Sequence, residues 1–370
     1  MPDQPLPSTE RLLLGPGPSP VSDRVRRALG APPRSHLDPE FVLLLDDVRR
    51  HLTTLFNAAE GYFTCALSGT GTTGMDAAAV NLVEPGMSVL CVVNGYFGDR
   101  LSQIFRRQGA FVERLEGEWG RAIDPAQVER ALADGRFDVV GLVHGETSTG
   151  VMNPVEAIAP IVRKRDALLV VDAVTSLGAV PVDVTAWDID VCYSCSQKGL
   201  GAPSGLAPIT FSSRARQQRM LLPDFSLDIQ KLEDFWVRRQ YHHTISAPLI
   251  YALHAALAEL HEEGLPARWQ RHAAAHLALV EGLASIDLQL LPAKDHRLPS
   301  LNAVRVPKGV DASVVRDHLL SRHNIEIGAG LGPLAGRIWR IGLMGSGATL
   351  GNVSRVVAAL ADALGRTPGR

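Results

Sequence analysis

The chain has 370 residues, of which 46% are hydrophobic and 21% charged, and this composition predicts a globular protein of two or three domains rather than a disordered chain. Its 37 basic and 39 acidic residues give a formal charge of -2, which argues against a nucleic-acid binder and a polybasic membrane binder. No apolar run is long enough to span a bilayer, the first ten residues do not resemble a secretory signal, and only four cysteines are present. These features predict a cytoplasmic protein with reduced thiols.

Short apolar runs alternate with helix-like stretches from residue 62 to residue 211. Between the first two runs, Met75, Ala78 and Leu82 follow helical spacing, and Pro85 and Gly86 end that helix. Continuous apolar strands that alternate with helices predict an α/β fold with a mostly parallel sheet, covered by helices on both faces. The expected strands are residues 62–67, 88–93, 138–143, 168–171, 191–194 and 206–211.

The last third of the chain mixes helices and strands differently. A long helix over residues 248–263 ends at Gly264. The sequence then predicts a helix near 267–284, a strand at 301–306, a helix near 312–321, a strand at 338–343 and a last helix after Asn352. We therefore expect an N-terminal arm at 1–20, a large domain at 21–263 and a smaller C-terminal α/β domain at 264–370.

A glycine-rich motif follows the first expected strand, where ligands bind in open α/β sheets. Residues 68–74 have the sequence SGTGTTG, and Gly69, Gly71 and Gly74 match the GxGxxG pattern of dinucleotide sites. The acidic residue that should follow the next strand is missing, because Asn94 and Gly95 stand there. Backbone N–H groups at a helix N-terminus and the threonine hydroxyls instead favour a single phosphate group, while a ligand-free turn stays open.

Two charged residues stand at the ends of later strands. Asp172 ends the fourth run and Lys198 follows the fifth. Alone, the aspartate could be a helix N-cap and the lysine a solvated charge. Together with a phosphate cradle they suggest pyridoxal phosphate, because lysine forms a Schiff base with the cofactor aldehyde and aspartate keeps the pyridine nitrogen protonated.

Eight motifs, in this order, resemble those of the class V aminotransferases, specifically the alanine–glyoxylate / serine–pyruvate aminotransferase family. The similarity extends over about residues 11–365. The motifs are LLLGPGP at 12–18, SGTG at 68–71, NGYFG at 94–98, HGETSTG at 144–150, VDAV at 171–174, SQK at 196–198, YHHT at 241–244 and RIGL at 340–343.

The resemblance implies a pyridoxal phosphate enzyme of fold type I, a homodimer with active sites at the subunit interface and no metal. Lys198 is then the Schiff-base lysine and Asp172 the partner of the pyridine nitrogen. Arg340 clamps the substrate carboxylate and Gly15 lines the substrate pocket, although Arg340 in its apolar strand would alone also fit an edge-strand charge. The other implied cofactor contacts are Thr70, Gly71, Thr72 and Gln197 on the phosphate, Tyr241 and Thr244 on the phosphate from the second subunit, Phe97 stacked on the ring, and Thr147 beside the ring.

The reaction expected from the resemblance is a ping-pong transamination from alanine or serine to glyoxylate or pyruvate. One alternative keeps the cofactor but makes the enzyme a lyase or desulfurase, which usually needs a nucleophilic cysteine on a mobile loop. The cysteines here lie in apolar runs, and Cys192 and Cys195 lack partners for a zinc site, so we expect buried structural thiols. A second alternative is an NAD-dependent oxidoreductase that uses the glycine motif.

Overall fold

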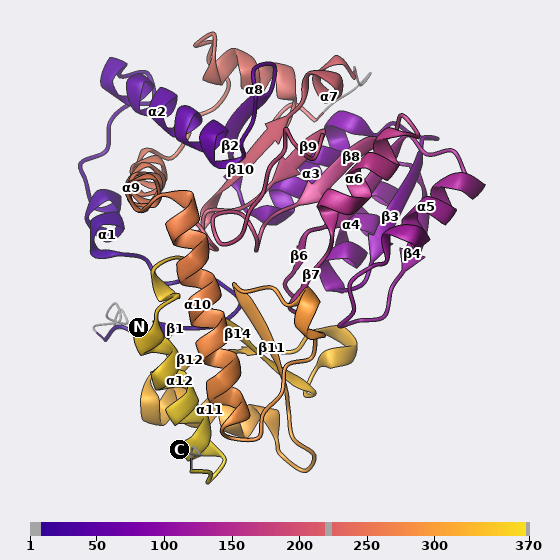
Figure 1. Ribbon diagram of the computed structural model, residues 1–370. Helices are drawn as coiled ribbons and strands as arrows, with labels where there is room; N and C mark the ends of the chain where they lie inside the picture. The colour runs from indigo at the N-terminus through magenta and orange to yellow at the C-terminus, as the bar shows by residue number, and fades with distance from the viewer. Residues whose placement is uncertain (1–8, 219–223, 368–370) are drawn as a thin grey trace, which may run out of the picture.

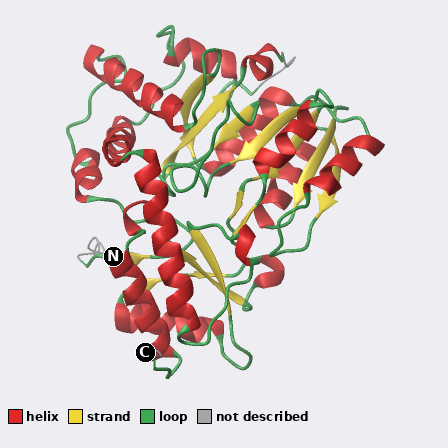
Figure 2. Cartoon of the chain, viewed as in Figure 1, coloured by secondary structure: helices red, strands yellow, loops and turns green. Residues whose placement is uncertain are grey.

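The computed structural model describes residues 9–218 and 224–367, and its strands fall into two main groups (Figures 1 and 2). The larger group is a seven-stranded sheet in the order β2-β10-β9-β8-β5-β3-β4. Strand β10 alone runs opposite to the other six strands of this sheet, so the α/β class with a mostly parallel sheet is confirmed. Its strands are β2 (Phe63–Gly69), β3 (Ser88–Val93), β4 (Phe111–Glu116), β5 (Val139–Val143), β8 (Leu168–Asp172), β9 (Val191–Tyr193) and β10 (Gly205–Phe211).

The sequence pattern missed the edge strand β4. None of its residues is fully buried, and the Phe111 side chain at its start is 72% exposed. The six predicted strands are buried nearly throughout because helices cover both faces, so they appear as continuous apolar runs. An edge strand with mixed exposure has no such run.

Helices connect the parallel strands and cover the sheet (Figure 1). Helix α3 packs beside α4 and helix α5 beside α6. Right-handed crossovers place these two pairs on opposite faces. The helices of this part are α1 (Asp23–Leu29), α2 (Pro39–Leu55), α3 (Gly71–Leu82), α4 (Tyr96–Arg107), α5 (Pro125–Asp134), α6 (Val155–Arg163), α7 (Ser213–Gln217), α8 (Ile229–Trp236) and α9 (Ala247–Glu263).

The smaller group is built on a three-stranded sheet in the order β11-β14-β13, with long helices packed beside it (Figure 1). The N-terminal segment joins this group, because β1 pairs with β12 and Leu14 is part of its core. The elements are β1 (Leu12–Leu13), α10 (Leu265–Ala284), β11 (Leu301–Arg305), α11 (Ala312–His323), β12 (Ile325–Glu326), β13 (Gly328–Ala329), β14 (Ile338–Gly342) and α12 (Leu350–Ala363).

The hydrophobic cores follow the same division. The main cluster of buried side chains draws on residues from Val25 to Leu260, and the second on Leu14 and residues from Ala275 to Ala361. This distribution supports the expected boundary near Gly264, which stays a prediction.

No helix in the described part of the chain is long and apolar enough to cross a bilayer. The remaining short elements are the hairpin of β6 (Gly145–Glu146) and β7 (Val151–Met152), and 3-10 turns at Lys294–His296, Gly332–Leu334 and Gly345–Gly347.

Candidate active site

A cavity of about 170 Å³ lies at the carboxyl ends of the strands in the large sheet. The direction of the strands explains which residues line the cavity. Strands β2, β5, β8 and β9 all run the same way, and polar residues follow each of them at this edge. Eight of the expected site residues line it: Thr70, Gly71, Thr72, Phe97, Thr147, Asp172, Gln197 and Lys198. Four further lining residues were not expected: Met75, Arg100, Val174 and Cys195.

The glycine-rich motif forms the turn from β2 into α3. Thr70 is the N-cap, and its backbone N–H donates to the Thr73 hydroxyl at 3.1 Å. The next residues therefore present helix N-terminal N–H groups at the cavity, which is a favourable place for a phosphate. Gly74 is required by close packing, since a Cβ there would lie 2.9 Å from the Tyr193 ring.

Arg100 adds a cation to this part of the cavity. Its Nη1 donates to the Thr72 hydroxyl at 3.0 Å, and its guanidinium lies 5.0 Å from the Phe97 ring centre. Phe97 and Arg100 are three positions apart on α4, so they share one face of the helix. This helical spacing from Phe97 is the feature of the sequence that could have predicted Arg100 at the site.

Asp172 is a buried carboxylate that forms no ion pair in the described part of the chain. Its side chain accepts the Val174 N–H at 2.8 Å, and within the described residues no lysine, arginine or histidine lies at ion-pair distance. Burial raises the pKa of Asp172 to about 7, and the charge of Glu146 adds to that shift. The Val174 N–H, the Tyr193 side chain and the positive charge of Lys198 oppose it. A protonated pyridine nitrogen would supply a cation at ion-pair distance, so the site fits pyridoxal phosphate.

The N-terminal segment covers Lys198. The lysine Nζ donates to the backbone oxygen of Pro16, and the Ser19 hydroxyl donates to the Lys198 backbone oxygen at 2.9 Å. Burial lowers the pKa of Lys198, and the positive charge of Arg340 lowers it further, against the opposing effects of Cys195 and Asp172. The lysine is therefore closer to its neutral, basic form than an exposed lysine.

Arg340 lies in the central strand of the small sheet, between β11 and β13, so the edge-strand interpretation is wrong. Its Nε donates to the Ala329 backbone oxygen at 2.6 Å, and its Nη1 to the Thr147 backbone oxygen at 3.4 Å. It is 7% exposed, and burial lowers its pKa to about 10. No described carboxylate forms an ion pair with this guanidinium, and it lies beside the cavity residue Thr147.

Glu146 is a buried site residue that sequence reasoning did not single out, although it lies in the HGETSTG motif. Its carboxylate accepts the backbone N–H groups of Phe97 at 3.2 Å, Gly98 at 3.1 Å and Ser148 at 3.1 Å, and the Ser148 hydroxyl at 2.6 Å. Burial raises the pKa of Glu146, and these donors oppose that shift. The carboxylate thus fixes the start of α4, which carries Phe97.

Four expected site residues do not line the cavity of this chain, and Arg340, which lies beside it, is one of them. Tyr241 is 65% exposed, and Thr244 is exposed as well. Gly15 packs through its backbone against β13 and β14, where a Cβ on Gly342 would lie 2.1 Å from the Gly15 oxygen. Gly15 therefore lies against the small sheet that carries Arg340.

The four cysteines are buried free thiols, as their apolar surroundings predict. Cys195 reaches the cavity wall, but burial raises its pKa to about 12, so it is a neutral thiol at physiological pH. The arrangement argues against the lyase or desulfurase alternative, which needs a thiolate nucleophile. The dinucleotide alternative gains no support either. Asn94 and Gly95 follow β3, where a dinucleotide site would need an acidic residue.

Comparisons with known proteins identify the family of this chain. The family model for aminotransferase class-V matches residues 26–336. The chain is 36% identical to the alanine–glyoxylate aminotransferase of Drosophila melanogaster, over 98% of this chain and 94% of that protein. It is also 36% identical to the (S)-ureidoglycine–glyoxylate transaminase of Bacillus subtilis (strain 168), over 95% of this chain and 89% of that protein.

A solved structure gives the same result. The alanine–glyoxylate aminotransferase of Nostoc sp. superimposes with a TM-score of 0.95 and 43% sequence identity, over 98% of both chains. Family model, sequence relatives and structure cover nearly the whole chain. This chain therefore belongs to the class-V aminotransferases and is a pyridoxal phosphate-dependent transaminase.

Proposed function

We propose that the enzyme transfers the amino group of alanine or serine to glyoxylate in a ping-pong reaction, with pyruvate as the alternative acceptor. The observation that carries this proposal is Arg340, a buried guanidinium beside the cavity without a described carboxylate partner. A small amino or oxo acid would supply that carboxylate, which the planar fork binds through two hydrogen bonds. Glyoxylate is favoured as acceptor because the names of the Drosophila, Bacillus and Nostoc relatives share it.

The cavity residues divide between the ring and the phosphate of the cofactor. Pyridoxal phosphate, when bound, withdraws electrons from the substrate Cα and so weakens its C–H bond. We propose that Asp172 keeps the pyridine nitrogen protonated and that Phe97 lies against the ring face, with Thr147 beside the ring. The phosphate would be held by Thr70, Gly71, Thr72 and Gln197 of this chain and by Tyr241 and Thr244 of a second copy.

Lys198 would have two roles. Its Nζ would hold the cofactor covalently, and after an amino acid has displaced it, the same nitrogen would remove the proton from the substrate Cα. The burial that lowers the pKa of Lys198 makes it a better base near neutral pH. Gly15 packs against the strand that carries Arg340, so the arm and the guanidinium would together define the substrate pocket.

We also propose that the enzyme is a homodimer with shared active sites. Several large apolar side chains are exposed on this chain, including Leu37 at 63%, Leu43 at 67% and Tyr241 at 65%. The His36 and Tyr241 rings lie 5.4 Å apart, so part of this apolar surface adjoins the loop that carries Thr244. A second copy that covers this surface would bury it and bring the loop to the partner's cavity.

A cytoplasmic location is proposed on the state of the thiols. All four cysteines are free, buried and without a disulfide. Reduced thiols are usual in the cytoplasm and unusual in oxidising compartments. Fractionation of the native cells, with the protein detected by antibody, tests this location.

An assay with the purified holoenzyme tests the reaction. Alanine, serine and ureidoglycine are each offered with glyoxylate, and glycine and the new oxo acid are measured by mass spectrometry. Glycine should form with alanine or serine, and ureidoglycine serves as the competing donor. If alanine forms from pyruvate but no glycine forms from glyoxylate, glyoxylate is not the acceptor. If no amino group reaches either acceptor, the proposed reaction is overturned.

A further inference from the structure

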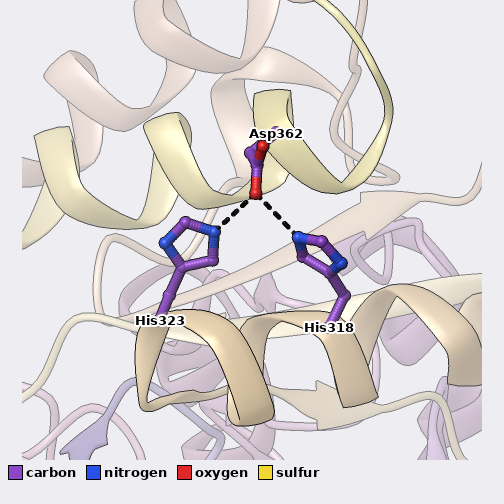
Figure 3. Close-up of side chains that lie close together, drawn as sticks. All are labelled: His318, His323 and Asp362. Atoms are coloured by element: carbon purple, nitrogen blue, oxygen red, sulfur yellow. Dashed lines mark hydrogen bonds and ion pairs between the residues drawn. The ribbon is translucent and has the colours of Figure 1, made fainter.

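Two histidines and an aspartate converge on the outer side of the small domain (Figure 3). His318 and His323 are on α11, and Asp362 is on the neighbouring helix α12. The Nε2 atoms of the two rings lie 2.7 and 2.8 Å from the same carboxylate oxygen, Oδ2 of Asp362. Both imidazoles thus point their Nε2 atoms at the same carboxylate oxygen (Figure 3).

The spacing of these atoms suits a metal ion. The three ligand atoms all lie within 4.8 Å of one another. Zinc binds imidazole nitrogen and carboxylate oxygen at about 2.0–2.2 Å, so two ligands of a tetrahedral site lie roughly 3.3 Å apart. The nitrogen–oxygen distances need to lengthen by only about half an ångström to reach that value. Asp362 can make this adjustment, since its side chain is 55% exposed.

The surroundings leave the cluster available to a cation. In the described part of the chain, no lysine or arginine forms an ion pair with Asp362, so its negative charge faces only the two imidazoles. Each ring is 32% exposed, which leaves a path for an ion and a position for water. An ordinary surface ion pair needs one histidine. Here two histidine rings each direct their Nε2 atom at one oxygen of Asp362.

We propose that His318, His323 and Asp362 bind one divalent transition-metal ion, with water in the remaining position. Two imidazoles and one carboxylate favour zinc, and also suit copper or nickel, over magnesium or calcium, which prefer oxygen ligands. The ion would join the last turn of α11 to α12. Leu319 and Leu360 already pack in the core shared by these helices, so the metal would reinforce an existing contact and stabilise the small domain.

This site is separate from the transamination chemistry. Its ligands come from α11 and α12 of the small domain, whereas the cavity is lined by residues 70–198 of the large one. The metal would therefore stabilise the fold without taking part in the reaction. It follows that removing a ligand should change zinc binding and leave the turnover of the holoenzyme unchanged.

Zinc titration of the chelator-treated holoenzyme tests the proposal. Isothermal calorimetry in a non-coordinating buffer should show one zinc per chain with micromolar affinity. His318→Asn and His323→Asn should each lose it, while His296→Asn, an exposed histidine elsewhere on the small domain, should keep it. Zinc should also raise the Tm of the wild type and of His296→Asn, but not of the two ligand variants.

Two results would overturn the proposal. One is an equal zinc stoichiometry and Tm change in the wild type and in His318→Asn and His323→Asn, which would mean adventitious binding elsewhere. The other is a wild-type crystal soaked in zinc that shows no anomalous peak between the three side chains. This second measurement uses the unaltered chain, so it does not depend on how the variants fold.

Discussion

The side-chain Nζ of Lys198 donates a hydrogen bond to the backbone oxygen of Pro16, 182 positions earlier in the chain. The arm that makes this contact also pairs with β12 and packs into the second core, so it links the lysine to the smaller group of strands. The position of the reactive amine is thus set by a segment far from it in sequence. Gly17, the next residue of the arm, is the position at which this contact can be tested.

Gly17→Ala should reduce the activity strongly. Gly17 has a φ of +117°, and a Cβ there would lie 2.4 Å from the lysine Nζ, so an alanine must displace the amine or the arm. We expect kcat to fall by about tenfold or more, since misplacing a reacting group by an ångström can cost that much. Steady-state kinetics of the holoenzyme measure it.

Gly86→Ala is the matched control for that variant. Gly86 also has a positive φ, of +92°, but a Cβ there would meet nothing within 4 Å. Both variants therefore carry a backbone strain of roughly 1–3 kcal/mol, and only one of them crowds the lysine. Equal losses of kcat in the two would show that strain alone, without the lysine contact, accounts for the effect.

Asp172→Asn should change how the stability of the cofactor-free protein depends on pH. The pKa of Asp172 is raised from 3.8 to about 7, so between these values the folded state holds a proton that the unfolded state has lost. The wild type therefore loses stability as pH rises through this window, by at most roughly 4 kcal/mol from this group. Asparagine mimics the protonated acid at every pH, so the variant should lose less between pH 5 and pH 8.

Urea unfolding of the cofactor-free protein at both pH values measures this difference, with the exposed Asp295→Asn as control. The same Asp172 variant should bind pyridoxal phosphate at least about tenfold more weakly, because the partner of the ring nitrogen has lost its charge. Identical losses of stability in wild type and variant would mean that Asp172 is not the group responsible.

The sequence located the centre of the site because that centre depends on strands. Asp172 and Lys198 each follow a continuous apolar run, and in a parallel sheet such positions must meet at one edge. The contact of Pro16 with Lys198 has no such signature, since it joins two loops that are 182 positions apart in the sequence.

Arg340 shows a second limit of sequence reasoning. A charged residue within an apolar strand has the same local pattern at a sheet edge and at its centre, and only the strand order separates the two. Edge strand β4 was missed for a related reason, because partial exposure removes its apolar run. What the local pattern cannot supply is therefore the order of the strands and the pairing of distant loops.

Arg340→Lys should raise the KM of both the amino acid and the oxo acid. Lysine keeps the positive charge but loses the planar fork, and with it a hydrogen bond to a charged group, which corresponds to roughly 10- to 100-fold. The cofactor absorbance of the holoenzyme should stay the same. Arg305→Lys on the exposed end of β11 is the control. An unchanged KM for both substrates would remove Arg340 from the substrate site.

Glu146→Gln should weaken both the fold and the cofactor site. All four groups that contact the carboxylate are hydrogen-bond donors. The side-chain NH₂ of a glutamine is also a donor, so it would face some of them without an acceptor between. We expect a loss of about 1–3 kcal/mol in the free energy of unfolding. Because Phe97 would shift with the start of α4, the affinity for pyridoxal phosphate should fall as well. Exposed Glu156→Gln on α6 should affect neither quantity, and a fully stable Glu146→Gln with unchanged affinity would contradict the assigned role.

Complementation between two inactive variants tests the shared active site. Lys198→Ala lacks the reactive amine, and the double variant Tyr241→Phe, Thr244→Ala lacks the groups proposed to reach the partner's phosphate site. In a mixed dimer, one site combines the intact lysine of one subunit with the intact loop of the other. Random mixing gives half mixed dimers with one intact site each, so co-expression should restore roughly a quarter of the wild-type activity.

The pairing of Lys198→Ala with Asp172→Ala is the control, because both residues line the cavity of the same chain. Every site of their mixed dimer lacks one or the other, so no activity should return. Equal recovery in the two mixtures would be incompatible with Tyr241 and Thr244 acting across the interface. Recovery in the first mixture alone would instead show that these exposed residues complete the cavity of a second copy, as their position outside the cavity of their own chain suggests.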